Sequence, residues 1–173
     1  ILVLDDYHVI EAKGDGAASR ELILVIDNLG WMHVSSLQNL FQEHGYYLTL
    51  AEPYLSLIPS ETEISKKCLL AGSPTYAGID STSYAAIIER GWVPYFNDHA
   101  FRYISGIGSL SAIETIDAAT YVVNYLAVDK ALHKSAEEIG MPHRDHIYHL
   151  LEKLVENTIS FIEKHSLEEN IRI

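Results

Sequence analysis

The chain has 173 residues, 48% of them apolar, and carries a formal net charge of -12 with an estimated pI near 5.0. This length is sufficient for one ordinary hydrophobic core and short for two domains. The acidic charge disfavours nucleic-acid binding through a basic face, and a phosphate-bearing substrate would need bound cations to offset the repulsion.

The single cysteine, Cys68, excludes an internal disulfide and a Cys-rich zinc site, and it fits a reducing compartment. No apolar run approaches the roughly 18 to 20 residues that a membrane span needs. Asp5 and Asp6 interrupt the apolar start too early for the core of a signal peptide. We therefore expect a cytoplasmic protein that has no membrane partner.

Two short apolar runs, Ile1 to Leu4 and Glu21 to Asp27, predict strands, with a turn-like segment at 13–16 between them. The second run is the stronger strand. Its residues Leu22 to Ile26 are all apolar without alternation, which predicts a strand covered on both faces, as in a parallel sheet flanked by helices.

The remaining pattern alternates between helices and strands. We expect helices at 35–44, 63–70, 83–90, 113–119 and 143–165, extended segments at 46–58, 92–96 and 121–128, a Gly-rich loop around Gly106 and Gly108, and a last strand starting at Ile171. The first of these helices should end at Gly45, and the last carries a clear apolar stripe. This order favours an α/β fold with a doubly wound, mostly parallel sheet flanked by helices, in a single domain spanning residues 1–173.

Asp27 is the first candidate functional residue. It follows five apolar residues and precedes Asn28-Leu29-Gly30, so a carboxylate lies where a buried strand ends. A fixed oxygen at this place binds a hard divalent cation well. The structural alternative is that Asp27 caps the following segment, since Asp is common in turns and at helix starts.

The segment Pro59-Ser60-Glu61-Thr62-Glu63-Ile64-Ser65 places hydroxyl groups at a turn that opens a predicted helix. Free amide protons and the dipole at a helix N-terminus stabilise a phosphoryl oxyanion and ease the loss of a hydroxyl proton, so a Thr or Ser here could attack phosphorus. The alternative is a capping box of Ser60 with Glu63, or a cap formed by Thr62.

Asp129 and His133 stand four residues apart at the end of the predicted strand 121–128. Open α/β sheets hold their ligands at this end of their strands. Positions i and i+4 share one face of a helical turn, and a carboxylate with an imidazole suits zinc or manganese. The alternative is a strand-end cap beside an unrelated surface histidine.

Two further clusters have metal-binding chemistry. They are Asp98 with His99, and the group His143, Asp145, His146 and His149 at the start of the last helix. A polar, solvated first turn is the simplest account of the second cluster. Trp31, Trp92 and the tyrosines are interpreted as core and rim packing, because no basic residues are interleaved with them.

Taken in order, three motifs resemble those of PglZ domains, a branch of the alkaline-phosphatase superfamily. They are Leu24-Val25-Ile26-Asp27-Asn28-Leu29, the stretch Pro59 to Ser65 ending in Leu70-Ala71-Gly72, and Asn124-Tyr125-Leu126-Ala127-Val128-Asp129 with His133. Each motif alone is weak, but their order and their shared position at strand ends are specific. The resemblance covers most of the chain and implies an alkaline-phosphatase-like core.

The resemblance also implies an activity, the hydrolysis of phosphate esters with phosphodiesters favoured. Asp27 and Thr62 would bind one divalent ion, Asp129 and His133 a second, and Thr62 would be the nucleophile. The two ions, zinc or alternatively manganese, would neutralise substrate charge, lower the pKa of the attacking hydroxyl and stabilise the leaving oxygen. The expected partner is a phosphate-ester substrate, a class that includes nucleotides and oligonucleotides.

The chain departs from the family pattern in three ways. Members usually have an Asp-His-Gly motif on the strand after the long helix and a later His, whereas this chain stops at Ile173, about where that strand begins. We therefore expect the domain to be incomplete at its C-terminus. Asn28 replaces the Gly or Ala that is common after the first Asp, and Lys66 stands where Arg is often found. Asp98-His99 is not the missing motif, because it precedes Asp129.

Two other functions stay open. A non-catalytic PglZ-like interaction module, in phage defence or signalling, would keep the fold and lose the metal site. A plain nucleotide- or partner-binding α/β domain predicts that Asp27, Thr62, Asp129 and His133 do not cluster.

Overall fold

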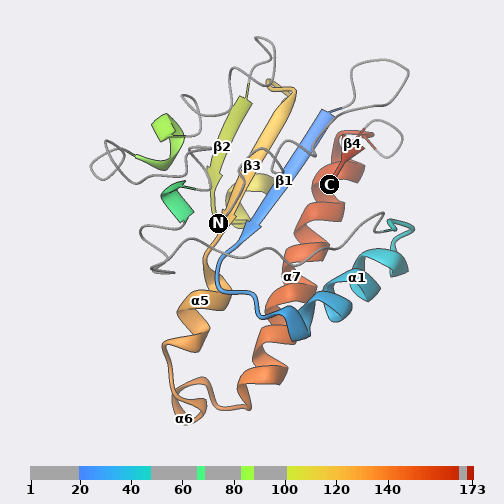
Figure 1. Cartoon of the computed structure of the whole chain (residues 1–173). Coiled ribbons are helices and arrows are strands. Elements are labelled where there is room, and N and C mark those ends of the chain that lie inside the picture. Colours follow the sequence, from blue (N-terminus) through green and yellow to red (C-terminus); the bar gives the residue numbers. More distant parts are fainter. Residues whose placement is uncertain (1–19, 48–65, 69–82, 88–100, 168–170) are drawn as a thin grey trace, which may run out of the picture.

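The computed structural model describes residues 20–47, 66–68, 83–87, 101–167 and 171–173, and it has a layered α/β architecture (Figure 1). Within these residues, four strands form one parallel sheet in the order β2-β3-β1-β4. Their bounds are β1 Arg20–Ile26, β2 Phe101–Ser105, β3 Thr120–Tyr125 and β4 Ile171–Arg172. The predicted parallel sheet flanked by helices is confirmed.

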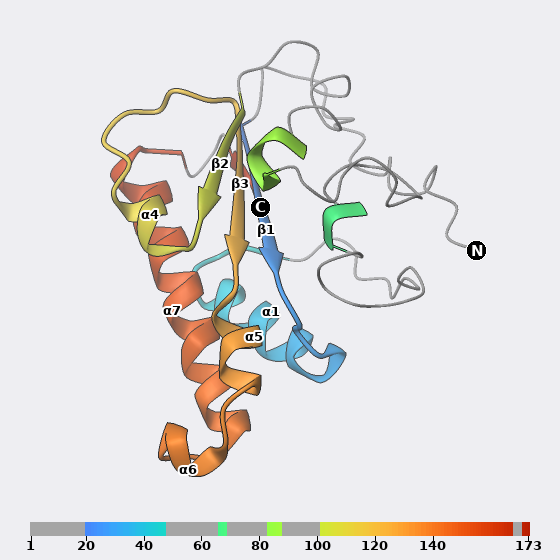
Figure 2. The same ribbon diagram turned by 90° about the vertical axis from the view of Figure 1, so that its left-hand side faces the viewer.

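The helices connect and cover these strands. Their bounds are η2 Trp31–His33, α1 Val34–Glu43, α4 Gly108–Ser111, α5 Ala127–Leu132, α6 Ala136–Ile139 and α7 His143–Lys164, with short helical turns at 66–68 and 84–87. Figure 2 shows α4 and α7 on one side of the sheet and the two short turns on the other. The sheet is therefore the middle layer of three.

Strand β1 is covered on both faces, as its uninterrupted apolar run predicts. Successive side chains of a strand point to opposite faces. Leu22 is buried in the main core, against which Leu24 and Ile26 pack while partly buried. On the other face, Ile23 and Val25 are partly buried against the second cluster, which Ile87 and Val122 form.

The long helix α7 supplies most of the main core. Its buried residues recur at helical spacing along one face: Ile147, Leu151, Leu154, Val155, Thr158, Ile159, Phe161 and Ile162. The helix packs against α1, α4 and α5. The helices predicted at 35–44 and 143–165 are confirmed, and Gly45 follows α1 with a φ of 85°, a conformation that glycine adopts without steric cost.

The strand predicted at 121–128 ends earlier, at Tyr125. The backbone of Leu126 leaves the extended conformation, with φ -95° and ψ 1°, and its carbonyl oxygen accepts a hydrogen bond from the Lys130 N–H at 3.0 Å. Val128 and Asp129 therefore lie in the helix α5. Asp129 still lies just beyond the carboxyl end of β3, as required for a strand-end site.

The helix predicted at 113–119 is wrong, because a buried tyrosine holds this segment in an irregular conformation. The Tyr121 hydroxyl accepts hydrogen bonds from the N–H groups of Asp117 (3.0 Å) and Ala118 (3.2 Å) and donates one to Asp117 Oδ1 (3.1 Å). Burial raises the pKa of the Tyr121 phenol, so it remains a protonated donor. The helix of this connection is α4, which begins at Gly108, inside the predicted Gly-rich loop.

Changing Tyr121 to Phe tests this account. The variant keeps the buried ring and removes the hydroxyl that satisfies two backbone amides, so we expect the free energy of unfolding to fall by about 1–3 kcal/mol. Chemical denaturation measures the change. Tyr148→Phe is the matched control, because the Tyr148 ring is partly exposed and its hydroxyl has no partner among the described residues. Equal effects of the two changes would contradict the account.

Some predicted elements have no structural counterpart to compare. The strands predicted at Ile1 to Leu4 and at 92–96 lie outside the described residues, as does nearly all of the extended segment 46–58. Strand β2 was not predicted. Its five residues include Arg102, which is exposed and forms an ion pair with Asp117, so the segment lacks the continuous apolar run of β1.

Candidate functional site

The ends of β1 and β3 bring two distant sequence motifs together. The strands are neighbours in parallel register, with Ile26 opposite Tyr125, and the Asp27 N–H donates to the Tyr125 carbonyl oxygen at 3.1 Å. Asn28 Nδ2 then donates to Asp129 Oδ1 at 3.3 Å, joining residues 101 positions apart. Two of the three motifs that resemble PglZ domains thus meet at the carboxyl end of the sheet.

Asn28 makes this approach through its backbone conformation. Its φ is 59°, in the left-handed region that Asn and Gly tolerate best among the amino acids. The replacement of Gly or Ala by Asn at this position is therefore compatible with a tight turn, and it adds a side-chain amide that reaches Asp129.

Asp129 and His133 form the predicted pair on one helical face. His133 Nε2 lies 3.5 Å from Asp129 Oδ1, with the two side chains 76% and 22% exposed. An oxygen and a nitrogen donor are thus adjacent, with the imidazole exposed and the carboxylate partly buried. This donor set fits two ligands of a zinc or manganese ion, since both metals accept carboxylate and imidazole.

The carboxylate of Asp27, unlike that of Asp129, forms a buried ion pair with a lysine. Its Oδ2 lies 2.6 Å from Lys66 Nζ, and the side chains of Asp27 and Lys66 are only 9% and 8% exposed. The Lys66 ammonium also lies 5.2 Å from the centre of the Tyr84 ring, within cation–π range. The charge of Asp27 is therefore balanced by a cation of the chain itself, and a metal ion at Asp27 would have to compete with Lys66.

A series of aromatic and hydrogen-bonding contacts continues from Lys66 across this face of the sheet. The rings of Tyr84 and Tyr103 lie 6.4 Å apart, and the Tyr103 hydroxyl accepts a hydrogen bond from Asn124 Nδ2 at 2.9 Å. Asn124 is 2% exposed, and within the described structure its Oδ1 has no hydrogen-bond partner. Buried amide oxygens normally have a hydrogen-bond partner. The Asn124 Oδ1 is therefore an acceptor that could take a further hydrogen bond beside the strand end.

Four residues near this strand end were not predicted as site residues from the sequence: Lys66, Tyr84, Tyr103 and Asn124. The signal for Asn124 was present, because an amide side chain in the otherwise apolar run Tyr121 to Leu126 is unusual for a buried strand. Lys66 was noted only as a departure from the family pattern. Its pairing with Asp27 links positions 39 residues apart, so local pattern cannot reveal it.

Cys68 lies two residues from Lys66 and is buried. Burial raises the pKa of its thiol, so the side chain stays protonated at neutral pH. A protonated thiol is a poor metal ligand, since the thiolate is the binding form.

The other site residues predicted from the sequence either lie outside the described residues or pair with neighbouring groups of the chain. Thr62, Ser60, Asp98 and His99 lie outside the described residues. At the start of α7, His143 Nε2 lies 2.7 Å from the Lys134 carbonyl oxygen, and His149 Nδ1 lies 2.7 Å from Glu152 Oε2. In the part of the chain that the structure describes, no three His, Cys, Asp or Glu side chains lie together as a metal site.

Two further observations concern the surface. Trp31, interpreted from the sequence as core or rim packing, is 58% exposed, beside the turn that carries Asp27 and Asn28.

Among the described helices, none is long and apolar enough to cross a bilayer.

Comparison of the sequence with protein-family models and with curated proteins gave no match. The resemblance to PglZ domains therefore rests on the three sequence motifs.

Proposed function

We propose that this chain is the core of a metal-dependent hydrolase of phosphate esters, with phosphodiesters favoured, in the PglZ branch of the alkaline-phosphatase superfamily. The observation that supports this function best is the meeting of Asp27 and Asn28 with Asp129 and His133 at the carboxyl ends of adjacent parallel strands. The expectation that a plain nucleotide- or partner-binding domain would keep Asp27, Thr62, Asp129 and His133 apart stays a prediction, because Thr62 lies outside the described residues. The single cysteine supports a reducing, cytoplasmic location.

Each residue then has a distinct role. Asp129 and His133 would hold a divalent ion, zinc or manganese, which when bound neutralises substrate charge and lowers the pKa of a nearby hydroxyl. Asp27 would, with Thr62, hold the second ion once Lys66 has released its carboxylate. The Thr62 hydroxyl would lose its proton to solvent and form a bond to phosphorus as the bond from phosphorus to the leaving ester oxygen breaks in line. Water would then attack phosphorus, break the bond to Thr62 and release the product, which completes the hydrolysis.

Hydrolysis of bis-p-nitrophenyl phosphate with added zinc or manganese tests this function. Thr62→Ala removes the nucleophile, and Asp129→Asn and His133→Gln remove ligands, so we expect each to lower kcat/KM by at least about 100-fold. Metal binding should also weaken in Asp129→Asn and His133→Gln. His44→Gln, at an exposed position after α1, is the matched control and should leave both quantities unchanged.

Absence of metal binding in the unaltered protein would refute the metal-dependent mechanism. Activity that persists in Thr62→Ala would instead refute the assignment of the nucleophile.

The Asp27–Lys66 ion pair supports a second candidate function, a non-catalytic interaction module in phage defence or signalling. A buried lysine that neutralises the first metal-binding Asp is what a domain without metal requires. Measuring the affinity for zinc and manganese distinguishes the two candidate functions. The module binds no zinc or manganese tightly, and Asp129→Asn does not change what little it binds.

A further inference from the structure

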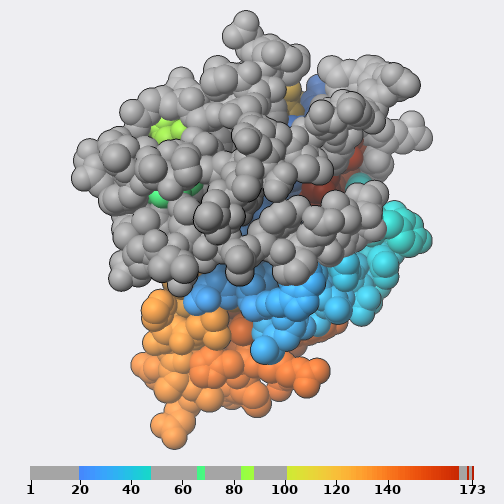
Figure 3. Space-filling view, viewed as in Figure 1, coloured from blue at the N-terminus to red at the C-terminus, as the bar shows by residue number. Residues whose placement is uncertain are grey.

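A separate hollow of about 400 Å³ opens between the start of α1 and the first turns of α7. It is lined by His33, Ser36, Arg144, Asp145, Tyr148 and His149. The blue segment after β1 and the orange α5 to α7 region lie against each other on the face seen in Figure 3. The hollow thus joins residues more than one hundred positions apart in the sequence, as His33 and Arg144 illustrate.

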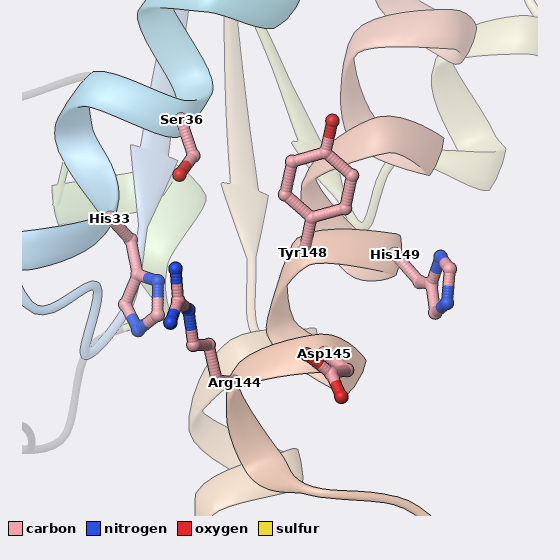
Figure 4. Close-up of a pocket in the computed structure, with 6 residues that line it drawn as sticks. All are labelled: His33, Ser36, Arg144, Asp145, Tyr148 and His149. Carbon is pink, nitrogen blue, oxygen red and sulfur yellow. The ribbon is translucent and has the colours of Figure 1, made fainter.

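Three hydrogen-bond donors meet in this hollow. Figure 4 shows the Arg144 guanidinium beside the His33 ring, with the Ser36 hydroxyl directed toward the same space. Within the described residues, none of these three side chains has a hydrogen-bond or ion-pair partner. Arg144 is always charged, a neutral His33 still offers one ring N–H, and Ser36 offers its hydroxyl.

The nearby carboxylates do not balance the Arg144 charge. Asp145 is directed away from the guanidinium in Figure 4, and Glu152 is engaged by His149 Nδ1 at 2.7 Å. An unpaired guanidinium beside an imidazole is notable in a chain whose formal net charge is -12. It attracts a negatively charged group, and the planar fork of Arg matches two oxygens of a phosphate.

We propose that this hollow binds a phosphate group through Arg144, His33 and Ser36. The guanidinium donates to two phosphate oxygens, and the imidazole N–H and the hydroxyl donate to the others. The Tyr148 ring lines the wall, where it contacts whatever carries the phosphate. This site needs no metal ion and is independent of the residues at the ends of β1 and β3.

Phosphate titration of the metal-free protein, kept in excess chelator at constant ionic strength and followed by NMR, tests the proposal. A few hydrogen bonds in an open hollow correspond to a dissociation constant on the order of 1 mM. We expect saturable shifts at His33, Ser36 and Arg144, and binding at least about tenfold weaker in Arg144→Gln. Arg102→Gln is the control, because it removes the same charge from an exposed site outside the hollow.

A second arm identifies the source of the phosphate. Tighter binding of AMP than of inorganic phosphate, lost in Arg144→Gln, would assign the site to a nucleotide, and equal binding would assign it to free phosphate. The absence of saturable shifts with either probe would overturn the proposal. So would equal weakening by Arg144→Gln and Arg102→Gln, because binding would then follow net charge alone.

Discussion

Replacing Lys66 with Met is expected to lower the free energy of unfolding by about 3–5 kcal/mol, because it leaves the Asp27 carboxylate buried without a counter-charge. Met keeps the length of the side chain and its apolar contacts, so the loss reports on charge rather than on packing. Denaturant unfolding in the presence of chelator measures it. Lys130→Met, at an exposed position of α5, is the control and should change stability by less than about 0.5 kcal/mol.

Two additions make the Lys66 experiment decisive. The double change Lys66→Met with Asp27→Asn should recover most of the loss, since removing both charges of a buried pair is far less costly than removing one. Zinc or manganese should stabilise Lys66→Met more than the unaltered protein if a metal competes with Lys66 for Asp27. A single Lys66→Met effect below about 1 kcal/mol would show that the pair is solvated in solution.

Replacing Phe161 with Ala should cost about 3–5 kcal/mol of folding free energy, the largest effect we expect from one apolar truncation. Phe161 is fully buried on α7, and its ring meets the rings of Tyr121 and His165 edge to face, at centroid distances of 5.4 and 5.0 Å. The change leaves a cavity between the helix and the sheet.

Thermal and denaturant unfolding of Phe161→Ala should be compared with Glu163→Ala, an exposed position on the same helix, which should lie within about 0.5 kcal/mol of the unaltered protein. Because Tyr121 also orders the segment before β3, Phe161→Ala should loosen the hydrogen bonds at Asp117 and Ala118. Faster amide hydrogen exchange there would detect this. Equal stabilities of the two variants would contradict the packing of α7 described above.

The sequence predicts best the helices and strands whose apolar residues follow a regular pattern along the chain. The uninterrupted run Leu22 to Ile26 predicts β1 covered on both faces, and the apolar stripe of residues 143–165 predicts α7 to within one residue. The i and i+4 spacing likewise predicts that Asp129 and His133 share a helical face. Each of these signals comes from neighbouring residues, so no knowledge of the rest of the chain is needed.

Prediction was poorer where hydrogen bonds from one buried side chain decide the local backbone conformation. The Tyr121 hydroxyl satisfies the backbone at 117–118, which replaces a helix expected over 113–119. The residues of that segment alone could not reveal this, because the competing hydrogen bonds come from a side chain of the following strand.

The sequence by itself determined the α/β class, the strand that ends just before Asp27 and the long helix α7, because burial periodicity is local and dominates the energy of regular elements. The tertiary structure alone decided which side chains lie beside Asp27, Asp129 and His33. The Lys66 ammonium on Asp27, the Asn28 amide on Asp129 and the Arg144 guanidinium beside His33 each join segments far apart in the chain. Such pairings depend on strand order and register, which bring together side chains that no local pattern connects.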